Sequence, residues 1–75
     1  MRGALHSKRY AKFRERLKAA RLEAKLTQTK AAEGLDKPQS FIQKSESGER
    51  RVDVIELEDF AKLYKKRIGY FFGKT

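Results

Sequence analysis

A short polar segment in the middle of the chain carries the side chains best suited to hydrogen-bond chemistry. Gln39 and Gln43 are four residues apart, so both would lie on one face of a helix. Ser40 and Lys44 share this spacing. A glutamine amide can pair bidentately with adenine, a serine hydroxyl donates or accepts, and a lysine could reach a guanine or a phosphate. These side chains could therefore hydrogen-bond a ligand such as DNA, and the alternative is a set of solvated residues at a helix start.

The residue types that catalysis needs are sparse in this chain. Cysteine is absent, and the single histidine, His6, lies in residues 1–7, which we expect to form a flexible basic tail. The sequence has no nucleophile–base pair, no metal-ligand cluster and no glycine-rich phosphate loop. We therefore predict a non-enzymatic protein with no cofactor and no metal. The lack of cysteine fits a reducing compartment, and we expect a cytoplasmic, nucleoid-associated protein.

The charge distribution indicates a polyanionic partner. The chain has 75 residues with 19 Lys/Arg and 10 Asp/Glu, a net charge of +9. Residues 1–30 hold ten of the basic residues and two of the acidic ones, so +8 of that charge lies in this part. A nucleic acid and an anionic membrane surface both fit this asymmetry, while an ordinary excess of lysine is the alternative. No apolar run is long enough to predict a membrane span.

Apolar residues at three- and four-residue spacings predict a single all-α domain over residues 8–75. Helices are expected at residues 8–25, 28–35 and 38–47, in a stripe from 54 to 64, and as a last short turn at 68–72. Thr27 and Asp53 are the expected N-caps, and Pro38 suits a first helical turn. Gly48 suits a left-handed helix end.

Residues 26–51 resemble the helix-turn-helix of the phage-repressor (Cro/C1, XRE) family and read LTQTKAAEGLDKPQSFIQKSESGERR. The matching positions are the opening Leu26-Thr27-Gln28, Ala32 at the helix crossing, Leu35 before the turn, the apolar anchor Ile42, and Glu46 followed by Gly48. The likeness extends over about residues 21–72. It implies a compact five-helix, lambda-repressor-like DNA-binding domain whose second and third helices form the helix-turn-helix.

The resemblance also implies roles for individual residues. The expected base-reading residues are, in decreasing order, Gln39, Ser40, Lys44 and Gln43. The expected phosphate-binding residues are Gln28 at the start of the second helix, where free N–H groups favour an anion, and Ser47, Arg50 and Arg51 after the third. The two arginines could instead belong to an ordinary polar loop. Arg21 and Glu46 correspond to a structural ion pair that ties the first helix to the third.

Three positions depart from the family pattern. Asp36 stands where the turn usually has glycine, although aspartate tolerates left-handed geometry better than most residues. Lys37 replaces a common apolar residue. Ser45 replaces the late apolar residue of the third helix, which would weaken the core or leave a gap for a partner side chain.

Together these features predict a sequence-specific regulator of transcription, most simply a repressor. We expect a homodimer on a double-stranded DNA operator whose half-sites lie about one helical turn apart. The alternative is an antitoxin-type module that binds a toxin and its own operator. Membrane-surface binding is the third hypothesis, but the aromatic residues of the first helix are needed in the core. Of the three aromatic residues at 70–72, one or two are expected to pack on the fourth helix and the rest to join a dimer surface or a linker to another domain.

Overall fold

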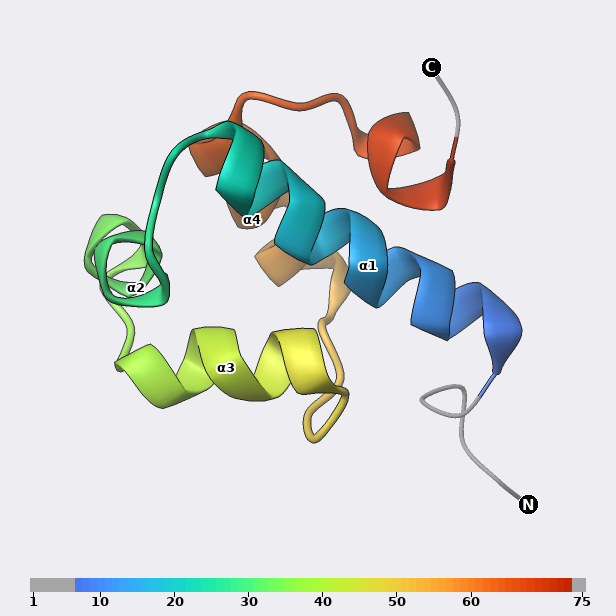
Figure 1. Ribbon diagram of the computed structural model, residues 1–75, viewed down its shortest axis with the longest axis horizontal. Helices are drawn as coiled ribbons and strands as arrows, with labels where there is room; N and C mark the ends of the chain where they lie inside the picture. The colour runs from blue at the N-terminus through green and yellow to red at the C-terminus, as the bar shows by residue number, and fades with distance from the viewer. Residues whose placement is uncertain (1–6, 74–75) are drawn as a thin grey trace.

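The computed structural model describes residues 7–73, which form four α-helices and a closing 3₁₀ helix (Figure 1). The elements are α1 (Lys8–Glu23), α2 (Gln28–Leu35), α3 (Gln39–Ser47), α4 (Val54–Tyr64) and η2 (Ile68–Phe72). The predicted all-α class is confirmed, but the expected fifth helix is a 3₁₀ helix. Its turns close by bonds from Tyr70 N to Arg67 O and from Gly73 N to Tyr70 O, at 3.0 and 3.1 Å. The predicted tail at 1–7 lies outside the described residues except for Ser7, the N-cap of α1.

Local chemistry sets the starts of the helices. Thr27 Oγ1 accepts a bond from the Lys30 backbone N–H at 3.0 Å, as its predicted capping role requires. Asp53 and Glu56 form a complete capping box at the start of α4. Pro38 is the N-cap of α3 and not its first helical residue, because its ψ of 155° is still extended.

Left-handed residues set several helix ends. Helix α1 ends two residues before the predicted Lys25, because Lys25 takes a φ of 61° and turns the chain. Asp36 has a φ of 56° and closes α2, so the turn of the helix-turn-helix survives without glycine. Gly48 ends α3 with a φ of 88°, as predicted.

The core lies where α1 crosses the other elements. Its buried apolar residues are Phe13, Leu17, Ala20, Ala31, Ala32, Ile42, Leu57, Phe60, Ala61, Tyr64 and Phe71. Small residues bring α2 close to its neighbours: a Cβ at Gly34 would lie 2.8 Å from Cδ1 of Leu63 on α4. Close packing of α2 on α4 thus accounts for a glycine inside a helix, where it otherwise weakens the helix.

Ser45 is fully buried although it stands at a position where an apolar residue is usual. Its hydroxyl donates to the Phe41 carbonyl oxygen one turn earlier, at 2.7 Å. The polar group is therefore satisfied within α3 itself, and burial costs little. The Phe41 ring stacks on Phe60 of α4 with centroids 5.7 Å apart, which adds apolar contact beside the small serine.

The C-terminal aromatic segment packs chiefly on α1, whereas the fourth helix was the expected partner. Figure 1 shows η2 beside α1, at the end of a loop that leads back from α4. Phe71 is fully buried, with its ring centroid 6.3 Å from that of Phe13. Arg16 donates from Nε to the Tyr70 carbonyl oxygen at 2.8 Å, and its guanidinium lies 4.4 Å from the Tyr70 ring centroid. Phe72 alone remains half exposed.

Candidate nucleic-acid interface

Helix α3 runs along one edge of the domain, and α2 lies at its N-terminal end (Figure 1). Ile42 and Ser45 are fully buried and turn the opposite face of α3 outward. All four predicted base-reading residues are on this outward face and exposed: Gln39, Ser40, Gln43 and Lys44. An α-helix with such a face fits the major groove, where its side chains can reach base edges.

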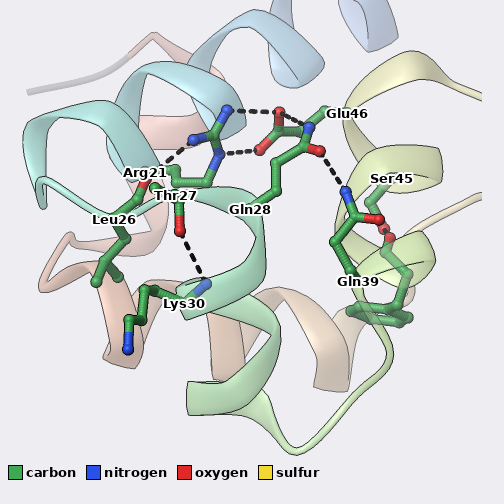
Figure 2. A network of polar contacts seen from close by, with 9 residues as sticks. Arg21, Leu26, Thr27, Gln28, Lys30, Gln39, Ser45 and Glu46 are labelled. Atoms are coloured by element: carbon green, nitrogen blue, oxygen red, sulfur yellow. Dashed lines mark hydrogen bonds and ion pairs between the residues drawn. The ribbon is translucent and has the colours of Figure 1, made fainter.

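A buried ion pair anchors the inner side of α3 (Figure 2). Arg21 of α1 donates from Nε to Glu46 Oε2 at 2.6 Å and from Nη2 to Oε1 at 3.1 Å. Its Nη1 donates to the Leu26 carbonyl oxygen at 2.9 Å, at the entry to α2. The two charged side chains are only 8% and 7% exposed, and the bond to Glu46 raises the pKa of Arg21 despite burial. The structure thus joins α1, the entry to α2 and α3 through one guanidinium, whereas the resemblance implied only the tie between α1 and α3.

Two glutamines extend this network to the surface (Figure 2). Gln28, the first residue of α2, donates from Nε2 to Glu46 Oε1 at 3.2 Å. Its Oε1 accepts from Gln39 Nε2 at 2.6 Å, so the first residue of α3 is held by the first residue of α2. An amide has two N–H groups and a carbonyl oxygen, so Gln39 keeps one donor and its acceptor for a bidentate contact. The chain of bonds fixes the orientation of that amide before any ligand arrives.

The arginines predicted to bind phosphate differ in their surroundings. Arg50 donates from Nη1 and Nη2 to the two carboxylate oxygens of Glu56, at 3.0 and 3.1 Å. Its guanidinium also lies 4.4 Å from the Phe41 ring centroid, and the bond to Arg50 lowers the pKa of Glu56. Arg51 is exposed and has no hydrogen bond or ion pair with any residue between 7 and 73. The geometry therefore gives Arg50 a role in the fold and leaves Arg51 available for a ligand.

An acidic residue that the sequence reading missed lies at the outer end of α3. Glu49 Oε2 accepts from the Ser47 hydroxyl at 3.1 Å and, in a longer contact, from Gln43 Nε2 at 3.4 Å. Both partners belong to the predicted DNA-contacting set. The signal in the sequence was an acid placed directly before two arginines, between Gly48 and Arg50.

A separate open apolar groove of about 570 Å³ is lined by no residue of α2 or α3. It runs between the start of α1 and the start of α4, with Tyr10 and Phe13 on one side and Val54 on the other. Val54 is 75% exposed, and Phe72 at the groove edge is 50% exposed. Within residues 7–73 no cluster of acidic, histidine or cysteine side chains could hold a metal ion. No helix in that same range has the length and hydropathy to cross a membrane.

The tight left-handed turn at Asp36 and the outward polar α3 define a helix-turn-helix protein. A family model described as helix-turn-helix matches residues 17–71, which include α2, α3 and α4 entirely. The chain therefore belongs to the helix-turn-helix family of the Cro/C1 (XRE) type. This family consists of DNA-binding domains rather than enzymes, and membership implies DNA binding of the kind that transcriptional regulators use. A search of curated proteins finds no match.

Proposed function

We propose that this chain recognises a specific double-stranded DNA operator as a homodimer and represses transcription by occupying it. The observation that supports this most directly is the outward face of α3, whose first residue is pre-oriented by the Gln28–Gln39 hydrogen bond. Gln39 and Ser40 would meet base edges first, and Lys44 and Gln43 lie one turn further along. Such a protein would work in the cytoplasm, at the nucleoid.

Phosphate contacts would come from both sides of this face. Gln28 lies at the N-terminus of α2, where free backbone N–H groups and the helix dipole favour an anion. Arg51 follows on the other side of α3, where the next phosphates would lie. The Ser47 hydroxyl donates to Glu49 and would have to turn away from that carboxylate to reach a phosphate. Because Arg50 is engaged by Glu56, we assign it to holding the loop after α3 in place rather than to a direct phosphate contact. These contacts would set register and affinity, and the strongly basic chain would add attraction of longer range.

The apolar groove between α1 and α4 is the surface we assign to the second copy. Its lining includes Val52, which directly follows Arg51 in the sequence. Arg9 and Asp53 line it with opposite charges, so two copies related by a two-fold axis can set each arginine against the partner's aspartate. A chain with a net charge of +9 repels itself elsewhere, which favours this apolar face for self-association.

The operator claim is tested by selecting bound sequences from random duplex DNA at two salt concentrations. We expect a palindrome with half-sites about 10 base pairs apart, centre to centre. Gln39→Ala should relax preference at one position of each half-site, whereas Arg51→Ala should weaken all sequences about equally. Binding that is uniform across sequences and vanishes with salt would reduce the protein to a nonspecific basic domain.

The dimer claim is tested by sedimentation equilibrium of Val54→Glu against a matched control, Leu22→Glu. Leu22 is also exposed, at 56%, but does not line the groove. We expect only Val54→Glu to yield a monomer and to weaken operator binding. The antitoxin alternative predicts a different protein in the groove: the chain alone would then be monomeric, and both variants would bind DNA like the parent.

A further inference from the structure

Glu49 places a negative charge inside the proposed DNA contact. It is exposed and directly follows Gly48, whose left-handed φ of 88° turns the chain at the end of α3. Two bonds link it to Ser47: the Ser47 hydroxyl donates to Glu49 Oε2 at 3.1 Å, and the Glu49 backbone N–H donates to Ser47 Oγ at 3.4 Å. The carboxylate therefore lies against the outward end of α3.

The carboxylate also determines what Gln43 can offer. Gln43 Nε2 lies 3.4 Å from Glu49 Oε2, so the amide turns its N–H groups toward the acid. One N–H group and the carbonyl oxygen of this amide remain for another molecule. The C-terminal half of the face thus adds a carboxylate, an acceptor only, beside the Gln43 amide. The N-terminal half, at Gln39, presents a donor and an acceptor together.

A carboxylate at this place is unfavourable against most DNA. Phosphates repel it, and base edges that display only acceptors, such as guanine N7 and O6, leave it unpaired. The amino group of cytosine or adenine is the major-groove donor that can satisfy it. The positive charge of this chain attracts any DNA duplex, whatever its sequence. A carboxylate that weakens binding to unsuitable sequences therefore adds discrimination that electrostatic attraction to phosphates cannot supply.

We propose that Glu49 is a specificity-determining residue of the DNA contact, selecting at one position per half-site a base that offers an amino donor. This inference rests on the proposed function. It specifies the type of base at one position of each operator half-site. Glu49 acts there directly, through its carboxylate, and also as a positioning residue for the Gln43 amide.

The test compares Glu49→Gln with Glu58→Gln in binding-site selection and in titrations with the selected operator and with random duplex. Glu58 is exposed on α4, so its substitution makes the same change of charge away from the α2–α3 face. We expect the parent to select cytosine or adenine at one position of each half-site. Glu49→Gln should reduce that preference by about fivefold and tighten binding to random duplex, since a single base contact discriminates at roughly this level. Glu58→Gln should leave the selected motif unchanged.

Equal effects of the two substitutions on the selected motif would overturn the inference, and so would a motif that Glu49→Gln leaves intact. If the parent selects no motif at all, the proposed function itself fails and takes this inference with it. The two failures are therefore distinguishable from the parent's selection alone. Thermal melting of both variants confirms that each is folded, as the exposure of both side chains leads us to expect.

Discussion

Replacing Glu46 with alanine should destabilise the domain far more than its size suggests. The substitution removes the acceptor of three donor groups, two from Arg21 and one from Gln28. Arg21 remains 6% exposed, so its charge would stay buried with only the Leu26 carbonyl as acceptor. Breaking a buried ion pair from one side costs about 3–5 kcal/mol, a large share of the stability of so small a domain.

Removing the stranded charge as well should return part of this loss. Glu46→Ala combined with Arg21→Met replaces the guanidinium with a shorter, flexible apolar side chain, and removing both partners of a buried pair is often close to neutral. The double variant should therefore be more stable than Glu46→Ala alone, with a coupling free energy of about 2 kcal/mol or more. For a domain of this size about 1 kcal/mol corresponds to 4–8 °C, so the difference is visible in a thermal scan.

The assay is urea unfolding of the parent, both single variants and the double variant, followed by far-ultraviolet circular dichroism. Glu58→Ala is the matched control, because it removes an exposed glutamate from another helix. It should change the free energy of unfolding by less than about 0.5 kcal/mol. A coupling free energy near zero would refute the reasoning, since the guanidinium and carboxylate would then be stabilised independently of each other.

Three further predictions concern single positions. Burial raises the pKa of the Tyr64 phenol, whose oxygen has no hydrogen-bond partner among residues 7–73. The native state therefore keeps a proton that the unfolded state releases above about pH 10, and stability falls as the pH rises past that point. Tyr64→Phe should raise the free energy of unfolding by about 1 kcal/mol at neutral pH and remove this loss of stability at alkaline pH. Equal urea midpoints for the parent and the variant, both at neutral pH and above about pH 10, would contradict the prediction. Arg50→Ala should lower the melting temperature with Arg51→Ala as its control, since only Arg50 pairs with Glu56 and stacks on an aromatic ring. Lys65→Gly should raise the free energy of urea unfolding by about 0.5–1 kcal/mol, because Lys65 caps α4 at a φ of 59°; a lower value would refute the strain argument.

The sequence predicted those parts of the structure that depend on near neighbours. Thr27 and Asp53 cap the helices expected of them, and α2 spans the residues predicted, because caps and apolar periodicity act within a few positions. The outward face of α3 follows from the same periodicity. Local rules also explain the small errors, since the left-handed Lys25 ends α1 where periodicity alone would have continued it.

Contacts between distant segments could not be read in the same way. Nothing in the local sequence distinguishes Arg50 from Arg51. Arg50 pairs with Glu56 and stacks on Phe41, whereas Arg51 makes no hydrogen bond or ion pair with residues 7–73. The packing of η2 on α1 depends on where the loop after α4 leads, which periodicity does not encode. The buried Ser45 looked like a defect because the sequence does not show that its hydroxyl bonds back within α3.

The hydrogen bonds that stabilise the fold and those that orient Gln39, the predicted base-reading residue, form one connected network. It begins at Arg21 in α1, passes through Glu46 and Gln28, and ends at Gln39 on the outer face. Glu46 accepts from Arg21 and from Gln28, and Gln28 accepts from Gln39. The orientation of the Gln39 amide therefore depends on a salt bridge that it does not touch. A substitution at Glu46 should accordingly blur base preference at the Gln39 position even in molecules that remain folded. Under the proposed function, stability and specificity would therefore be coupled, because the same buried carboxylate would serve both.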